Sequence, residues 1–227
     1  MPKKIIRVLL VVMLTGFILS ASGCKANEKT FPAKTIEWVE DENGFIQFFT
    51  NDKSNLGFGF LTWSNDSYED PMDTVEIEVK KVSGNENMGY GILFCFQNPE
   101  NYYRLLITTS GWYRISAKND GEFFSLPWME SEYLNQGLNE INKIKITRQV
   151  NTENNVIFSV CFNENEAAVV DNSYFTTFTG GYYGFYVGVG NSEDENFPQI
   201  PVDVRFKQIS PLETKQVEIS NKTIESI

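Results

Sequence analysis

Short apolar runs separated by turn residues are the feature that most limits how this chain can fold. Ten runs of five to eight residues are rich in Phe, Tyr, Val and Ile, and stretches such as DENG, SGNEN, QNPEN and NTENN separate them. This spacing, without long helical periodicity, predicts one all-β antiparallel β-sandwich. The predicted strands are Phe45–Thr50, Phe58–Trp63, Val75–Val82, Tyr90–Phe96, Tyr102–Thr108, Trp112–Lys118, Lys143–Thr147, Val156–Phe162, Tyr183–Val189 and Val202–Gln208.

The N-terminus has the parts of an export signal. A basic segment with Lys3, Lys4 and Arg7 precedes an apolar segment and then the small residues before Cys24, so residues 1–23 are predicted to be a signal peptide. The ending ASGC resembles a bacterial lipobox, which implies lipidation of Cys24 and anchoring to a membrane. The alternative is ordinary cleavage that leaves Cys24 as a free thiol.

The charge of the chain limits its partners. Loss of the signal peptide removes three basic residues and changes the net charge from −11 to −14. Nucleic acid and anionic lipid headgroups are therefore excluded as expected partners, whereas cationic protein patches, metal ions and neutral glycans stay open. Lys25, in place of the aspartate of the enterobacterial retention signal, favours an outer membrane or cell-surface location.

The chain contains no histidine. Ser-His-Asp and Cys-His catalysis are thereby excluded, and an enzyme would depend on carboxylates, tyrosine or lysine. Cys95 and Cys161 both lie in strand-like runs. An exported protein permits a disulfide between them, and two buried free thiols are the alternative.

A central stretch carries a resemblance to a known fold family. The segments GYGILFCFQNPENYYRLLITTSGWYRISAKNDGE and GGYYGFYVGVG, with a VCFNEN segment between them, resemble laminin-G-like or concanavalin A-like jelly-roll domains of exported bacterial proteins. The resemblance covers about residues 75 to 210 and implies a fold more than a function. The expected organisation is a tether over 24–34, a jelly-roll sandwich over 35–210 and a C-terminal tail over 211–227. Either the tail adds an edge strand through QVEIS or it is disordered.

The register of one hairpin predicts a candidate site. A three-residue loop, Thr109 to Gly111, would place Leu106 opposite Arg114 and Arg104 opposite Ser116. Tyr103 and Tyr113 would then belong to the core, while the other face would display Tyr102, Arg104, Trp112 and Arg114.

Two interpretations of that face remain open. A displayed tryptophan beside arginines suits carbohydrate recognition, because the ring stacks on a sugar and guanidinium groups donate to hydroxyls or carboxylates. Alternatively, Arg104 and Arg114 stack on Tyr102 and Trp112 and stiffen the hairpin, or the face is a second packing contact. We expect a non-catalytic, carbohydrate-binding envelope lipoprotein with no required cofactor. A protein–protein adhesin is the first alternative.

Two acidic segments give further alternatives. Glu76 and Glu78 share one face of a strand, as the carboxylates of jelly-roll glycoside hydrolases do, but Lys80 and Lys81 follow where that pattern has a third carboxylate. Alternating glutamates on a solvent-facing strand are the simpler interpretation. Glu193, Asp194 and Glu195 form an acidic loop that is a weak calcium candidate, with a solvated loop as the alternative.

Overall fold

The structure is a computed structural model of the chain. It describes residues 38–64, 74–150, 153, 155–171, 178, 180–190, 200–210 and 219–226. Cys24, the predicted signal peptide and tether, and the loop with Glu193, Asp194 and Glu195 lie outside the described residues. No helix in the described part of the chain is long and apolar enough to cross a membrane.

The described residues form two antiparallel sheets and one short 3-10 helix, η1 (Lys53–Asn55). Sheet A has the order β1-β2-β14-β4-β10-β11-β12, and sheet B has the order β15-β3-β13-β5-β6-β7-β8, with β9 paired to β7. The strands of sheet A are β1 (Trp38–Glu40), β2 (Ile46–Thr50), β4 (Thr74–Ser83), β10 (Asn142–Val150), β11 (Val156–Phe162), β12 (Asn165–Asp171) and β14 (Val202–Ser210). The strands of sheet B are β3 (Phe58–Ser64), β5 (Tyr90–Asn98), β6 (Asn101–Ile107), β7 (Trp112–Asn119), β8 (Glu122–Ser125), β9 (Met129–Glu130), β13 (Tyr182–Val189) and β15 (Ile219–Ser226).

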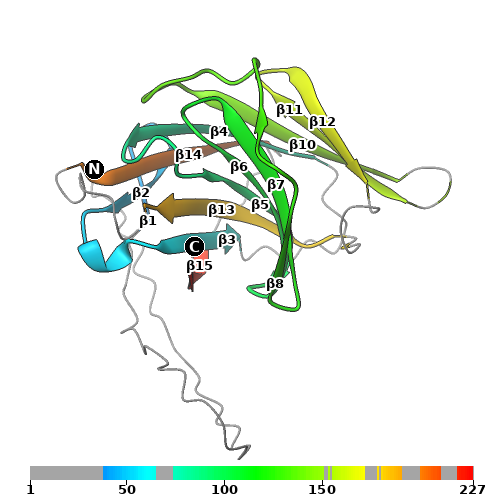
Figure 1. The fold of residues 1–227 in the computed structure, drawn as a ribbon, viewed down its shortest axis with the longest axis horizontal. Helices are drawn as coiled ribbons and strands as arrows, with labels where there is room; N and C mark the ends of the chain where they lie inside the picture. The colour runs from blue at the N-terminus through cyan, green and yellow to red at the C-terminus, as the bar shows by residue number, and fades with distance from the viewer. Residues whose placement is uncertain are drawn as a thin grey trace, which may run out of the picture.

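The two sheets stack as the layers of a jelly-roll sandwich, which confirms the predicted fold class. Figure 1 shows sheet B bending between β13 and β7, so that the β7–β8 hairpin extends below β13 and β3 in this view. All ten predicted strands are present. The predicted strands do not include β1, β8 or β9, which are only two to four residues long, and they give no bounds for β12.

The core between the layers is built from alternate strand positions. On β4, Val75, Ile77 and Val79 are buried, whereas the residues between them point away from the core. On the facing layer, β5 and β6 contribute Phe94 and Tyr103, whose ring centroids lie 5.3 Å apart. This alternation is the reason that the apolar runs fold as strands with one buried face.

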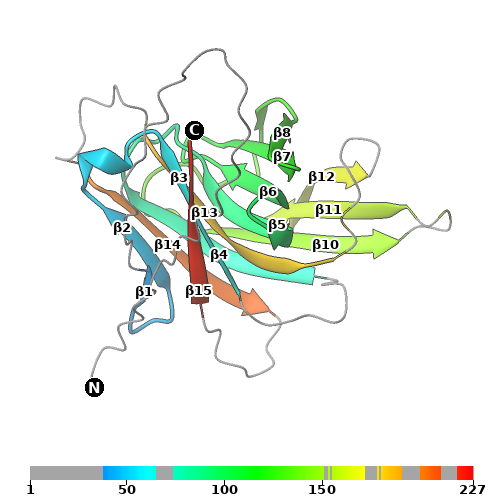
Figure 2. The same ribbon diagram turned by 90° about the horizontal axis from the view of Figure 1, so that it is seen from below.

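The open question of the tail has a partial answer. Residues Ile219–Ser226 form β15, which pairs with β3 at the edge of sheet B and appears beside it in Figure 2. The strand begins within the QVEIS segment and continues past it. The chain beyond residue 210 therefore contributes to the sandwich.

Candidate functional site

The outer surface of sheet B carries the candidate site, and we call it the sheet B face. It is defined by large side chains that point away from the main core. These are Trp63 of β3, Tyr182 and Tyr186 of β13, Phe96 of β5, Tyr102 and Arg104 of β6, Trp112 and Arg114 of β7, Phe123 of β8, and Trp128. Several of them form a second apolar cluster, separate from the main core.

The β6–β7 hairpin, which contributes both arginines to the sheet B face, has the predicted register. Leu106 lies opposite Arg114 and Arg104 lies opposite Ser116. The backbone N–H of Thr108 donates to the carbonyl oxygen of Trp112 at 2.8 Å, which closes the three-residue loop. Gly111 has φ +85°, the left-handed conformation that this loop requires. Tyr103 and Tyr113 are buried in the core and Trp112 is 41% exposed, as the register predicts.

Arg104 lies near the middle of the face, between two aromatic rings. Its guanidinium carbon is 4.8 Å from the ring centroid of Tyr186 and 4.4 Å from that of Phe123. The Nε–H donates to the hydroxyl of Ser116 at 2.9 Å. These contacts hold a cationic group over the sheet by stacking and by a hydrogen bond to an uncharged acceptor.

Tyr186 reaches Arg104 because the residue beneath its ring is small. A Cβ on Gly59 would lie 2.1 Å from the hydroxyl oxygen of Tyr186, so only glycine leaves room for the ring there. The ring is buried, and its contact with the guanidinium joins β13 to β6 across β5. One side of the face is therefore fixed by packing between distant parts of the chain.

Arg114 lies diagonally across the ladder from Arg104. Its Nε–H donates to the carbonyl oxygen of Leu126 at 3.1 Å, and its guanidinium carbon lies 5.7 Å from the ring centroid of Trp128. Burial lowers the pKa of Arg114, and the nearby positive charge of Arg104 lowers this pKa further. The two guanidinium groups thus repel each other in a half-buried setting.

Tyr102 is a correction to the predicted site. It is fully buried, stacked on Phe96 at 5.8 Å and in edge contact with Phe123 at 6.5 Å. A ligand cannot reach it, so Tyr102 supports the face from below. The alternative of a second packing contact is thus correct for this residue, although the arginines stack on Phe123, Tyr186 and Trp128 instead of on Tyr102 and Trp112.

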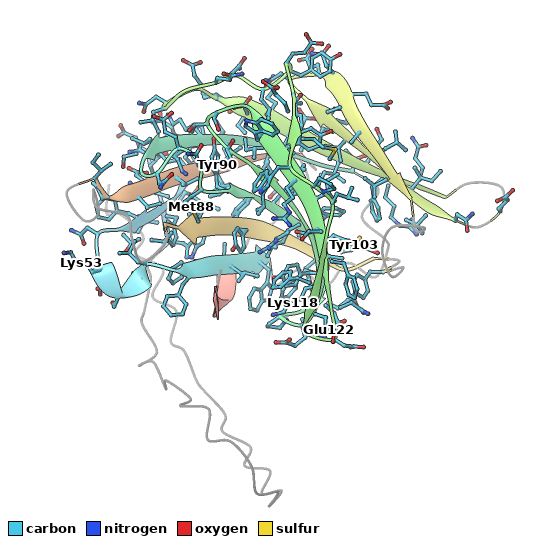
Figure 3. All side chains as sticks on the ribbon, viewed as in Figure 1. Lys53, Met88, Tyr90, Tyr103, Lys118 and Glu122 are labelled. Atoms are coloured by element: carbon cyan, nitrogen blue, oxygen red, sulfur yellow. The ribbon has the colours of Figure 1, made fainter. Side chains whose placement is uncertain are left out.

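Lys118 is a third cation on the same strand as Arg114, and it has a carboxylate partner. Its Nζ lies 3.5 Å from a carboxylate oxygen of Glu100 and 5.3 Å from the ring centroid of Phe123. Figure 3 shows Lys118 near Glu122 at the β7–β8 hairpin. The charge of Lys118 is therefore neutralised within the protein.

Glu76 and Glu78 lie far from this face. They point outward on β4 of sheet A, where Lys145 is opposite Glu76 and Lys143 is opposite Glu78. An enzyme that used these two carboxylates would therefore have its reaction centre on sheet A, away from the aromatic cluster of sheet B. The structure thus agrees with the simpler interpretation, in which Glu76 and Glu78 are alternating glutamates on a solvent-facing strand.

The cysteines do not form a disulfide. Cys95 is a buried free thiol on the inner side of sheet B, and Cys161 is a partly exposed free thiol on β11 of sheet A. Burial raises the pKa of Cys95 to about 12. Among the described residues, no group of three or more Cys, Asp or Glu side chains could hold a metal ion.

Sequence reasoning missed several residues of the face. Trp63, Phe123, Trp128 and Tyr186 come from segments outside the hairpin, and only the sheet order brings them together. Trp128 and Phe123 lie near the hairpin in sequence and were visible as aromatic residues after a DG turn. Nothing in the local pattern indicated that their rings fold over the arginines.

No protein-family model matches the chain, and no curated protein matches it. Among solved structures, it is similar to a glycoside hydrolase family 16 protein of a mixed-linkage glucan system of Bacteroides ovatus. That similarity has 10% identity, a TM-score of 0.49 and coverage of 77% of this chain and 85% of the other. An endo-β-galactosidase from Clostridium perfringens gives 12% identity, a TM-score of 0.43 and coverage of 76% and 54%. A structure from a study of endo-acting O-glycanases of the human gut microbiota gives 12% identity, a TM-score of 0.46 and coverage of 80% of this chain and 85% of the other.

These comparisons correct the predicted function class. The sequence analysis expected a non-catalytic binding module and no enzyme, whereas the similar solved structures are mostly glycoside hydrolases. The expectation of a non-enzyme is therefore withdrawn. At these identities and TM-scores no residue role transfers to the chain, and the site rests on its own geometry.

Proposed function

We propose that the chain is a glycan-active protein and that its carbohydrate lies on the sheet B face. The observation that carries the proposal is the gathering of aromatic rings and two arginines on one face, with Trp112 exposed at 41% and Phe123 at 42%. Exposed aromatic rings fit the apolar faces of sugar rings, and their polar neighbours then fix the orientation of the sugar.

The arginines supply the polar part of such a contact. A guanidinium has five N–H donors in a planar fork, and the hydrogen bond described for Arg114 uses only its Nε–H. No hydrogen bond described for Arg114 uses its other N–H groups, and the half-buried side chain is held against Trp128. Sugar hydroxyls are acceptors of the kind that this fork binds.

The register also brings a carboxylate next to the face. Glu130 of β9 lies directly opposite Trp112 of β7, and it is exposed. The described outward positions of β5, β6, β7 and β13 carry no carboxylate. Glycoside hydrolysis ordinarily uses a pair of carboxylates. Glu130 is the carboxylate that the register places beside Trp112, and it is therefore the first residue to test for turnover on this face.

A polysaccharide panel tests the proposal with the full chain purified in detergent. Binding and release of reducing ends are both measured. Trp112→Ala is expected to weaken the affinity for any bound glycan by about tenfold or more, if stacking of a sugar on the indole resembles that of a nucleic-acid base, which is worth on the order of 1–3 kcal/mol. The matched control is Phe49→Ala, because Phe49 is equally exposed, at 46%, but lies on sheet A.

Three results would decide this test. Loss in Trp112→Ala and none in Phe49→Ala supports the face, and loss of reducing-end release in Glu130→Gln would add a catalytic role. Equal binding by wild type and Trp112→Ala would show that the glycan lies elsewhere. A broad panel without any binding or turnover would refute a glycan-active function.

The anchoring of the protein is a separate proposal. We propose that Cys24 is lipidated and holds the sandwich at the cell envelope, outside the cytoplasm, on the outer membrane or cell surface, because the signal and the ASGC ending support it. A further proposal concerns the fold family: the hairpin segment and the GGYYGFYVGVG segment support grouping this jelly roll with the laminin-G-like domains. Mass spectrometry of the N-terminal peptide tests the anchor: acyl chains on Cys24, absent in Cys24→Ser, are expected, and an unmodified Cys24 would contradict it.

A further inference from the structure

Two like charges lie close together on the sheet B face. Arg104 is opposite Ser116 and Arg114 is two residues before Ser116, so the two arginines are diagonal neighbours on adjacent strands. Such positions are roughly 7–8 Å apart in an antiparallel sheet. Both side chains are half-buried, and water therefore screens their charges less than it would on an open surface.

The fixed contacts of Arg114 leave its charge uncompensated. Its hydrogen-bond acceptor is the carbonyl oxygen of Leu126 and its ring contact is Trp128, both without formal charge. No ion pair to Arg114 occurs within the part of the chain that the structure describes. Lys118, four residues later on the same face, is paired with Glu100. Among the described residues, Lys118 of β7 therefore has a carboxylate partner and Arg114 of β7 has none.

The charge of the whole chain makes this pair unusual. The net charge is −11, and acidic residues outnumber basic ones by 30 to 19. Carboxylates to neutralise an arginine are therefore plentiful. Burial lowers the pKa of Arg114, and the nearby positive charge of Arg104 lowers it further.

We infer that the glycan is acidic, and that a carboxylate or sulfate group on it binds between Arg104 and Arg114. This inference rests on the proposed function and names its ligand class. A planar guanidinium fork binds the oxygens of a carboxylate or sulfate through charge-assisted hydrogen bonds, which are about twice as strong as neutral ones. The rings of Trp112, Trp128 and Phe123 would contact the sugar that carries the anionic group.

Matched polymers test the inference on the full chain. Polygalacturonate is compared with its methyl ester, which keeps the backbone and removes the charge, and dextran sulfate is compared with dextran. Binding is measured by titration calorimetry at two salt concentrations. Arg114→Gln removes one candidate ligand group, and Lys145→Gln makes the same charge change on sheet A.

The expected result is at least tenfold tighter binding of one anionic polymer than of its neutral counterpart. Arg114→Gln is expected to lose roughly tenfold or more in affinity, the size of one charge-assisted interaction, and Lys145→Gln much less. Preference for polygalacturonate identifies a carboxylate ligand, and preference for dextran sulfate identifies a sulfated one. If Arg114→Gln does not fold, Arg114→Lys keeps the charge without the fork and is expected to weaken binding partially.

Other outcomes overturn the inference. Equal losses in Arg114→Gln and Lys145→Gln would show that only long-range charge acts. Binding of neutral glycans that depends on Trp112 but shows no preference for anionic polymers would refute the acidic ligand and leave the proposed function intact. Absence of any binding that depends on Trp112 would refute both.

Discussion

Two arginines on opposite sheets show how differently the two outer surfaces are built. Arg205 on sheet A donates to Asp203 at 3.2 Å and lies 3.7 Å from a carboxylate oxygen of Asp41, and its pKa is raised chiefly by the hydrogen bond to Asp203. Arg114 on sheet B is set against a carbonyl and an indole, and its pKa is lowered by burial and by Arg104. Carboxylates of the protein thus neutralise the charge of Arg205, whereas Arg114 has no ion pair among the described residues.

The same contrast extends to the neighbouring residues. The outer surface of sheet A places Glu76 and Glu78 opposite lysines, an arrangement that suits a solvated scaffold. The outer surface of sheet B gathers aromatic rings into a second cluster and exposes part of it. Contiguous apolar surface rimmed by polar groups is typical of interaction sites, and this is the surface on which we propose that a glycan binds.

The largest expected effect concerns the second cluster. Tyr102→Ala is expected to lower the free energy of unfolding by about 3–5 kcal/mol, since a large buried aromatic side chain is removed. Phe49→Ala, on the outer surface of sheet A, is expected to change it by less than about 0.5 kcal/mol because the ring is exposed. Urea unfolding measures both. A loss below 1 kcal/mol for Tyr102→Ala would mean that the sheet B face is not a packed layer.

The two free thiols offer a second comparison. The pKa of Cys95 is raised from 9.0 to about 12 by burial, so the folded state keeps its proton where the unfolded state loses it. Stability from this group is fully present below pH 9 and is lost as the pH rises from 9 toward 12. Between pH 9 and 10.5 the loss is expected to be about 2 kcal/mol, at roughly 1.4 kcal/mol per pH unit.

Variants separate this contribution from the tyrosines. Burial also raises the pKa of Tyr103, to about 12, so some alkaline destabilisation above pH 10 is expected to remain in every variant. Cys95→Ala should show a shallower decline between pH 9 and 10.5 in urea unfolding, and Cys161→Ala should match the wild type. Identical declines in both variants would contradict the burial assigned to Cys95.

The smallest expected effects are on sheet A. Glu76→Gln and Glu78→Gln are each expected to change the free energy of unfolding by no more than about 0.5–1 kcal/mol, because exposed cross-strand charge pairs contribute little. Neither substitution should affect glycan binding or turnover. Turnover abolished by either one would move the reaction to sheet A and reverse the comparison of the two surfaces.

The sequence predicted the part of the site that depends on local geometry. Alternation and the Thr109-Ser110-Gly111 loop were sufficient to place Arg104 and Arg114 on one face and Tyr103 in the core. Burial of Tyr102 was not predictable in that way, because its cover comes from Phe96 of β5 and Phe123 of β8. Tyr186 is more than 80 residues beyond Arg104 in the chain. Which strands neighbour β6 at that distance depends on the sheet order, and no local pattern encodes that order.

One measurement tests the central claim that a glycan lies on the sheet B face. Of the four tryptophans, Trp63, Trp112 and Trp128 belong to this face, and Trp38 is buried in the main core at 2% exposure. Titration of the full chain with a glycan from the panel should therefore change the intrinsic tryptophan fluorescence, and Trp112→Ala should remove most of that change while Phe49→Ala keeps it. A bound glycan that leaves the fluorescence of the wild type unchanged would contradict the claim.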